Sequence, residues 1–231
     1  MNPVTDARTV RDGRSTRWDR HRQERRRLLV RAARDAVHDL GPAASMDEIA
    51  AHARTSKSVF YRYFGDRAGL QRAVAQRATA HLERRLLEAA DAGDGGPESL
   101  RRMVAACLTV AAASPHVYAF AVDREDTASG SGGPVLTPFF ERVALLLEDG
   151  LTRALAGAGP TLHSPAVLHL WPRAAVGMVR SAVEAWLAAP EDERPDVDTT
   201  AAALADWLLH GVAPGHRSDD PGARRAGTAQ R

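Results

Sequence analysis

The amino-acid sequence predicts an all-α fold divided into two helical domains. Three observations support this prediction. Apolar residues recur at the spacing of one helix face in successive segments, and no segment alternates between apolar and polar residues as a half-buried strand does. Glycine- and proline-rich breaks separate these segments into pieces of helical length. With 231 residues, 44% of them hydrophobic, the chain is long enough and apolar enough to bury a core.

Charge is distributed unevenly between the two halves of the chain. The formal net charge is only +2. Residues 1–90 contain 19 Arg or Lys against 11 Asp or Glu, whereas residues 91–231 contain 12 against 18. A basic half joined to an acidic half indicates that only the first half meets a polyanion such as a nucleic acid.

The chain begins with a basic segment that is followed by a helix. Residues 1–18 are polar and rich in arginine, and we expect a flexible arm that either reaches the minor groove of DNA or remains disordered. From Asp19 to Leu40, apolar residues at steps of one, three and four form a single stripe, which predicts a helix. The Gly41-Pro42 pair is a typical helix end.

Two short helices follow. Ser45 and Glu48 have the spacing of a capping box, which starts a helix that we expect to end near Arg54. Ser56 is expected to cap the next helix, which runs to Phe64. A helix, a tight bend and a second helix form the helix-turn-helix arrangement, whose second helix enters the major groove. We therefore expect a three-helix DNA-binding domain over 19–66.

The third helix has one apolar face and one polar face. Phe60 and Phe64 are one turn apart and are expected to pack on the preceding helices. On the opposite face, lysine or arginine can donate to guanine, and a tyrosine hydroxyl can reach a phosphate oxygen. We expect this outward face to comprise Ser58, Tyr61 and Arg62, flanked by Lys57, Val59 and Tyr63.

A long helix and several shorter ones account for the rest of the chain. Residues 67–90 are expected to form a helix that links the two domains, followed by a glycine-rich junction at 91–97. Further helices are predicted at 98–113, 116–122, 134–156, 165–189 and 197–210. Pro172 indicates either a kink or a later start in the fourth of these. The second domain spans 67–213, and the polar tail 214–231 is expected to be disordered.

Other kinds of site find little support in the sequence. Cys107, the single cysteine, lies in an apolar run and is expected to be a core residue. His163 and His169 have no further ligands at metal spacing, so we expect no metal and no cofactor. No nucleophile elbow, P-loop or dinucleotide motif is present, so we do not expect an enzyme. Residues 103–122 are uncharged, but Ser114-Pro115-His116 interrupts them, so we expect two buried helices, no membrane partner and a cytoplasmic, nucleoid-associated protein.

The segments LLVRAARDAVHDLG, MDEIAAHARTSKSVFYRYF and DRAGL resemble the DNA-binding domain of tetracycline-repressor-like (TetR) family regulators. The resemblance covers about residues 23–74 and implies that Tyr61 and Arg67 touch phosphates. It also implies that Ser45 holds the backbone at the start of the second helix. The remaining DNA-binding residues that we expect are Thr55, Ser56, Lys57, Ser58, Arg62 and Tyr63.

Two positions depart from the family pattern. Arg54 stands in the bend where the family usually has glycine, and a left-handed conformation there would cost arginine about 1 kcal/mol. Arg67 stands in place of a common lysine and preserves the charge.

The resemblance further implies a homodimer whose second domain binds a small molecule. We expect that effector to be hydrophobic or amphipathic, and a vaguer similarity points to an acyl-CoA or another lipid-like molecule. The expected ligand-binding residues are Met103, Cys107, Tyr118, Phe120, Phe139, Phe140, Leu147, Trp171 and Met178. The expected dimer interface comprises Val183, Trp186, Leu204, Trp207 and Leu208.

We predict a ligand-responsive regulator of transcription, and we favour a repressor that binds a palindromic operator. An activator or global regulator of the same family remains open. The alternative from another class is a helical-bundle carrier or enzyme whose basic half is incidental. A footprint on double-stranded DNA distinguishes these classes.

Overall fold

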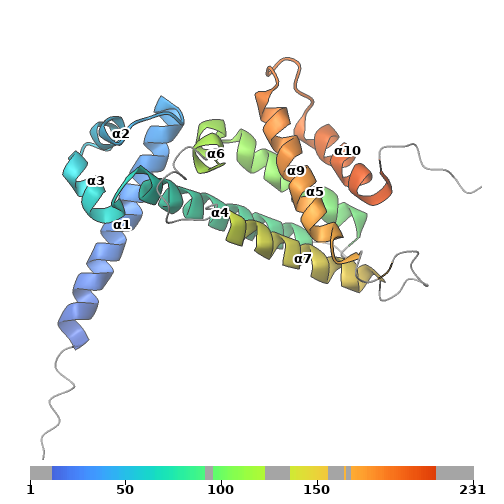
Figure 1. Cartoon of the computed structure of the whole chain (residues 1–231), viewed down its shortest axis with the longest axis horizontal. Helices are drawn as coiled ribbons and strands as arrows, with labels where there is room; N and C mark the ends of the chain where they lie inside the picture. Colours follow the sequence, from blue (N-terminus) through green and yellow to red (C-terminus); the bar gives the residue numbers. More distant parts are fainter. Residues whose placement is uncertain (1–11, 92–95, 123–135, 156–163, 165–167, 212–231) are drawn as a thin grey trace, which may run out of the picture.

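The computed structural model describes residues 12–91, 96–122, 136–155, 164 and 168–211 (Figure 1). All regular structure in these ranges is helical, as the sequence predicts. The helices are α1 (Asp12–Leu40), α2 (Met46–His52), α3 (Lys57–Phe64), α4 (Arg67–Asp91), α5 (Pro97–Ala112), α6 (Pro115–Val122), α7 (Thr137–Leu155), α9 (Trp171–Ala188) and α10 (Val197–His210).

Helices α1 to α3 and the first turns of α4 enclose one hydrophobic core. Phe60 and Phe64 lie in it together with Leu29, Ala33 and Ile49, as the sequence predicts. The two phenylalanine rings pack with their centroids 5.7 Å apart. Because both rings are buried in this core, they fix the rotation of α3 and leave its opposite face in solvent.

The starts of α2, α3 and α4 are capped in three different ways. Ser45 and Glu48 form the expected capping box, in which Glu48 N donates to Ser45 Oγ over 3.2 Å and Ser45 N donates to Glu48 Oε2 over 2.8 Å. Ser56 occupies the N-cap position of α3, but its side chain makes no capping hydrogen bond, contrary to our expectation. Asp66 caps α4 by accepting from Gly69 N over 2.6 Å.

Gly69 is required by the close approach of α3 and α4. A Cβ atom at this position would collide with the carbonyl oxygen of Phe64. Gly65 precedes α4 with a φ of 82°, a left-handed value that favours glycine. The turn from α3 to α4 therefore needs both glycines.

The second half of the molecule is built on α4 and α5, which pack along each other (Figure 1). Helix α10 covers α5, and α7 packs against α9. One core cluster joins α5, α9 and α10 through Leu108, Val183 and Leu204. A smaller cluster joins α4, α5 and α7 through Leu86, Met103 and Phe139.

Helix α6 turns back from α5 toward the first domain. The axes of α5 and α6 differ by 98°, and no single helix among the described residues is long and apolar enough to cross a membrane. The uncharged stretch 103–122 thus forms two helices, as the sequence predicts. Val117 and Phe120 of α6 join the core formed by α1 to α4, so α6 links the two halves.

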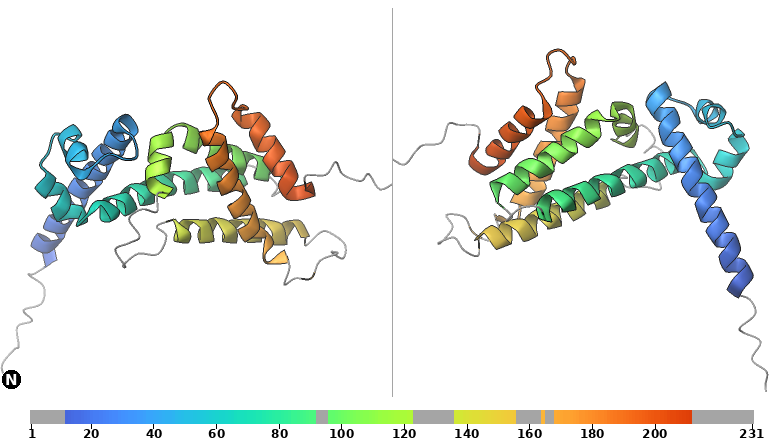
Figure 2. Two further views of the ribbon diagram at one scale, coloured as in Figure 1. Left: turned by 45° about the horizontal axis from the view of Figure 1, so that its top comes forward. Right: turned by 180° about the vertical axis from the view of Figure 1, so that it is seen from behind.

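Three boundaries differ from the sequence prediction. Helix α1 begins at Asp12, within the segment that we expected to be a flexible arm, and its first half projects away from the body of the molecule (Figure 2). Helix α9 begins at Trp171 with Pro172 in its first turn, so the proline marks a later start. Helix α7 begins at Thr137. The expected arm before residue 12, the junction at 92–95 and the tail 214–231 lie outside the described residues.

Candidate nucleic-acid interface and effector cavity

The outward face of α3 is the polar surface that the sequence predicts. Ser56, Lys57, Ser58 and Arg62 are exposed, and Tyr61 keeps 42% of its surface in solvent. Val59 and Tyr63 are half-buried and pack against the core of the first domain. The face therefore stands on a rigid support, which is what base recognition in a groove requires.

Lys57 is held at the edge of this face by an ion pair. Its Nζ donates to Asp47 Oδ2 over 2.7 Å, and both side chains are exposed. The hydrogen bond to Asp47 raises the pKa of Lys57 above its usual value, so the ammonium is charged at neutral pH. Lys57 Nζ also lies 5.7 Å from the centroid of the Tyr61 ring. A surface pair of this kind is weak and can exchange for a stronger partner.

The neighbouring groups are ordered by short contacts. Arg62 lies over the Tyr63 ring, with Cζ 5.4 Å from its centroid. The hydroxyls of Ser56 and Ser58 are 3.1 Å apart. Thr55 is half-buried in the bend, and its N–H donates to the Ala50 carbonyl over 3.0 Å. Ser45 is engaged in the capping box, so it fixes the start of α2.

The bend between α2 and α3 contains a strained residue. Arg54 has a φ of 51°, and no other non-glycine residue in the described ranges has a positive φ. The bend thus requires the left-handed conformation in which glycine is favoured. The Arg54 side chain is exposed next to α3.

Arg67, which the family resemblance implies is a phosphate ligand, is half-buried at the start of α4. Its guanidinium donates to the Pro42 carbonyl over 2.7 Å and lies 5.0 Å from the centroid of the Phe120 ring. Neither Pro42 nor Phe120 belongs to the outward face of α3. In this conformation Arg67 joins α4 to α6 and to the end of α1. The phosphate contact stays a prediction.

The projecting half of α1 is a further basic surface. Residues 17–28 are all exposed and contain six arginines against two acidic residues. Arg26 lies over the Phe64 ring, 5.4 Å from its centroid, so this surface continues to the base of α3. The six arginines are Arg17, Arg20, Arg22, Arg25, Arg26 and Arg27.

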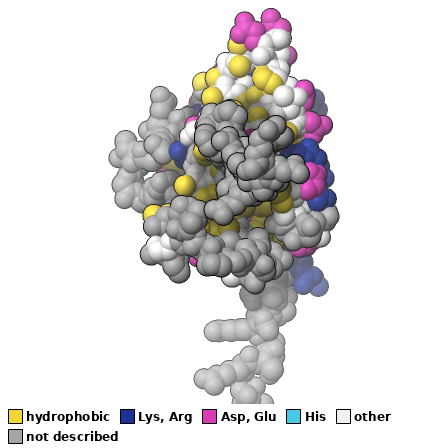
Figure 3. Space-filling view, turned by 90° about the vertical axis from the view of Figure 1, so that its right-hand side faces the viewer, with side chains coloured by type: hydrophobic (Ala, Val, Ile, Leu, Met, Phe, Trp, Pro, Cys, Tyr) yellow, Lys and Arg dark blue, Asp and Glu magenta, His cyan; other side chains and the backbone are white. Residues whose placement is uncertain are grey.

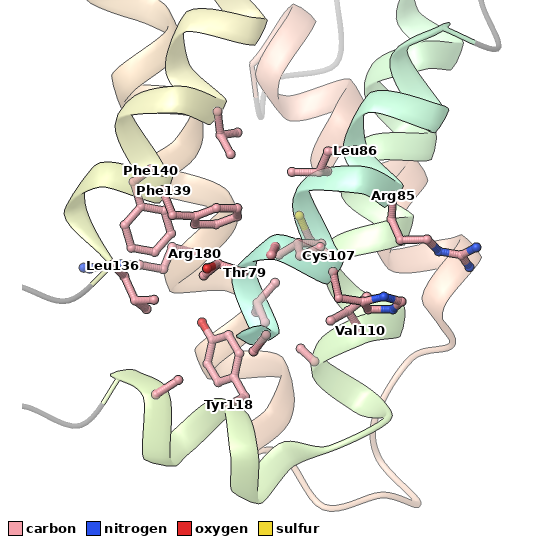
Figure 4. Close-up of a pocket in the computed structure, with 18 of the residues that line it drawn as sticks. Thr79, Arg85, Leu86, Cys107, Val110, Tyr118, Leu136, Phe139, Phe140 and Arg180 are labelled. Carbon is pink, nitrogen blue, oxygen red and sulfur yellow. The ribbon is translucent and has the colours of Figure 1, made fainter. Parts of the chain in front are cut away.

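A cavity of about 770 Å³ lies between α4, α5, α6, α7 and α9, and residues of α1 and α10 also border it (Figure 4). This volume lies within the range of about 300–1,000 Å³ that is typical of small-molecule sites. Six of the nine predicted ligand-binding residues line it, namely Met103, Cys107, Tyr118, Phe139, Phe140 and Leu147.

The other three predicted residues lie elsewhere. Phe120 is fully buried in the core of the first domain, where its ring contacts Arg67. Trp171 borders a smaller hollow near the end of α7 and donates from Nε1 to the Leu208 carbonyl over 3.2 Å. Met178 is 40% exposed on α9. Helical spacing alone did not reveal which face of each helix looks into the cavity.

The cavity also contains polar residues that the sequence reasoning missed. Arg180 and Thr79 lie with Tyr118 around the aromatic rings (Figure 4). The spacing of Arg180 from Val176 and Val183 places it on an apolar helix face, which was an available signal. Burial raises the pKa of the Cys107 thiol to about 12 and also raises the pKa of the Tyr118 hydroxyl. Both groups are therefore neutral at physiological pH.

The predicted dimer residues divide into two groups. Val183 and Leu204 are buried inside the protomer, in the cluster of α5, α9 and α10, so they do not offer a surface to a partner. Trp186 and Leu208 are half-buried against the same cluster, and Trp186 Nε1 donates to the Pro195 carbonyl over 2.8 Å. Trp207 is 42% exposed. Of the five, Trp207 is the residue whose side chain is open to solvent.

Relatives of known class match this chain over most of its length. The family described as bacterial regulatory proteins of the tetR family matches residues 29–74. An HTH-type transcriptional regulator of Mycobacterium tuberculosis strain H37Rv is 33% identical over 202 residues, which cover 87% of this chain and 84% of that protein. This chain belongs to the TetR family of transcriptional regulators. It is therefore a DNA-binding regulator rather than an enzyme.

Solved structures of TetR regulators share its fold. LfrR from Mycobacterium smegmatis, in complex with proflavine, matches with a TM-score of 0.56 and 23% identity over 85% of this chain and 99% of that one. The fatty acid degradation regulator FadR from Bacillus halodurans matches with a TM-score of 0.58 and 17% identity over 81% and 95%. No group of His, Cys, Asp or Glu suited to a metal occurs among the described residues of this TetR regulator.

Proposed function

We propose that this TetR-family regulator is a repressor that binds a near-palindromic operator as a homodimer and releases it when a hydrophobic or amphipathic molecule fills the cavity. The observation that carries the proposal is the connection of two sites. A polar recognition face and a large apolar cavity are joined by two helices, α4 and α6.

The recognition face supplies the contacts to DNA. Lys57 leaves Asp47 and donates to a base edge, while Tyr61 and Arg62 hold the adjacent phosphates or bases. Two such faces, about 34–36 Å apart in a dimer, reach successive major grooves on one side of the duplex. The basic first half of α1 adds phosphate contacts beyond each half-site, because its arginines outnumber its acidic residues.

The exposed faces of α9 and α10 are the proposed dimer surface. On α9 the exposed stripe consists mainly of small residues, which permit close helix packing, and Gly177 has open space where a Cβ would be. Trp207 and Leu209 on α10 and Met178 on α9 add large exposed apolar groups. Acidic side chains mark the turn between the two helices, with hydrophobic groups gathered below it (Figure 3). The stripe on α9 comprises Ala174, Gly177, Met178, Ser181, Ala185 and Ala188.

Charge placed on this surface tests the dimer. Ser181→Glu and Trp207→Glu should each split the dimer in sedimentation experiments and abolish operator binding, because a carboxylate would be buried against an apolar partner. Leu145→Glu is the matched control, since Leu145 is 55% exposed but lies on α7. If both α9–α10 variants still sediment as dimers, the interface lies elsewhere.

The cavity supports an apolar effector. Its inner part is lined by Phe139, Phe140, Met103 and Leu147, which favour a hydrophobic body. Among TetR structures with the same fold, LfrR holds proflavine and FadR regulates fatty acid degradation. An acyl-CoA or another lipid-like molecule therefore remains a candidate.

Helix α6 is the proposed route from cavity to DNA. Tyr118 and Ala121 face the cavity, whereas Phe120 is buried in the core of the first domain. Gln71 Nε2 donates to the Phe120 carbonyl over 2.8 Å, and His116 Nδ1 donates to the His38 carbonyl over 2.9 Å. A ligand that displaces Tyr118 therefore moves the end of α1 and the start of α4. This shifts the dimer toward a conformation whose two recognition helices are badly spaced for DNA, provided that the ligand binds this conformation more tightly than the DNA-binding one.

Mapping of the protein on its own genome, followed by footprinting, tests the proposal. We expect protection of a near-palindromic site, and transcription of an adjacent gene that rises when the protein is deleted. A fall in transcription on deletion would indicate an activator. Protection of no site would exclude operator binding and favour a carrier.

A further inference from the structure

The charged residues that line the cavity indicate which chemical class of effector it binds. Seven arginines line it, and no aspartate or glutamate is among its lining residues in the described part of the chain. Six of the seven lie within residues 1–90, the basic half of the chain, and Arg180 is the one that the acidic second half contributes. Most of these arginines lie on the outer side of α4 or on α1, and Figure 4 shows Arg85 directed away from the aromatic rings.

Arg180 is the cation that lies with the aromatic rings. It lies on α9, and its Cζ lies 5.6 Å from the centroid of the Phe140 ring. Its Nε is buried and has no hydrogen-bond partner. The Glu184 carboxylate lies nearby, with Oε1 3.7 Å from Nε, and the side chains of Arg180 and Glu184 are 36% and 43% exposed. A buried N–H without a partner destabilises the protein, so the site favours an acceptor that can enter it.

A hydroxyl lies on the opposite wall. Tyr118 projects from α6 into the cavity, with its oxygen directed toward that of Thr79 (Figure 4). Burial keeps Tyr118 in its neutral form, in which the O–H donates. An arginine N–H and a phenolic O–H that border one apolar space form a donor pair suited to a carboxylate.

We propose that the effector is an amphipathic carboxylic acid whose carboxylate is bound by Arg180 and Tyr118 and whose apolar body lies against Phe139 and Met103. The assignment deepens the proposed function, on which it rests only in treating this cavity as the effector site. A free carboxylate fits Arg180 better than an acyl-CoA, because the thioester of an acyl-CoA has no negative charge to pair with the guanidinium.

The test compares an acid with its neutral counterpart in the absence of DNA. Sodium decanoate and decan-1-ol, and 2-naphthoate and 2-naphthalenemethanol, are titrated into the full-length protein by calorimetry. In at least one pair the acid should bind about tenfold to a hundredfold more tightly than the alcohol, which is the difference in affinity expected from hydrogen bonds to a charged group. If neither acid binds more tightly than its alcohol, the inference is overturned.

Variants assign the preference to Arg180. Arg180→Met should abolish the preference for the acid and leave the affinity for the alcohol unchanged, and Arg180→Lys should retain part of the preference. Glu184→Gln should strengthen acid binding alone, because it removes the carboxylate that faces the same guanidinium. Arg142→Met is the matched control, since Arg142 lies on the surface of α7 and pairs with Glu83 over 2.9 Å.

Two outcomes separate this inference from the proposed function. If Arg180→Met keeps the acid preference, or if decanoyl-CoA binds while decanoate does not, the carboxylate site is wrong even when the protein binds an operator. If the acids bind with the expected preference but never release DNA, the site stands and the repressor mechanism fails.

Discussion

The DNA-binding region and the effector region use their apolar side chains in opposite ways. In the first, Phe60, Ile49 and Val37 are fully buried in one continuous core, and every helix is fixed against it. In the second, the phenylalanines and Met103 surround a cavity of about 770 Å³. The first arrangement holds a surface rigid, and the second leaves helices free to adopt another packing around a ligand.

The contrast shows why the two regions need a specific joint. A close-packed core transmits displacement rather than absorbing it. Helix α6 contributes Phe120 to that core and Tyr118 to the cavity. We therefore propose that a displacement of Tyr118 by a ligand is passed to the DNA-binding domain. Arg67 strengthens the joint by its contacts with Pro42 and Phe120.

The largest expected difference is in stability. Phe60→Ala should lower the free energy of unfolding by about 3–5 kcal/mol, since it empties a fully packed site. Phe140→Ala should lower it by less than half as much, because the half-buried Phe140 ring already borders a void. Urea denaturation measures both. Equal losses would mean that the cavity is filled in the free protein.

The next effect concerns recognition by the rigid region. Lys57→Ala should weaken operator binding by about 1–3 kcal/mol and relax base preference at one position of each half-site. Binding to a library of single-base operator variants measures this, with Arg142→Ala as a control on the other region. A uniform loss on all sequences would mean that Lys57 contacts only phosphate.

A smaller gain is expected from the strained bend. Arg54→Gly should raise the free energy of unfolding by about 1 kcal/mol, because glycine adopts a φ of 51° without the steric penalty. Gly65→Ala is the reciprocal control and should destabilise, since its φ is 82°. If Arg54→Gly is destabilising, the arginine side chain makes a contact that outweighs the strain.

The smallest expected effect is on salt dependence. Arg67→Ala should leave the slope of log K against log salt nearly unchanged, because the guanidinium is engaged within the protein. It should lower thermal stability, since the joint between α4 and α6 is lost. A phosphate contact would instead reduce the slope by about 0.9. Such a reduction would restore the role that the family resemblance implies.

The sequence was most informative where local rules govern structure. The capping box at Ser45 and the buried pair Phe60 and Phe64 follow from short-range geometry. The left-handed bend at Arg54 was suggested by the family resemblance, in which glycine usually stands there. The start of α1 was missed because residues 17–28 are all exposed, so no apolar stripe marks this part of the helix.

The effector region was less predictable because its features depend on tertiary contacts. Apolar spacing identified Phe139 and Tyr118 as inward-facing but also selected Phe120, which packs on the other domain. Val183 and Leu204 looked equally suited to a partner surface or to the protomer core. Only the packing of α5 between α4 and α10 decides such cases.

Operator binding by the purified protein at moderate ionic strength, against an excess of random duplex, is the most direct test of the link between α3 and DNA. We expect selection of a near-palindromic site with half-sites about 34–36 Å apart, and loss of that selection in Lys57→Ala. Equal affinity for every duplex, in the wild-type protein, would rule out α3 as a reader of sequence.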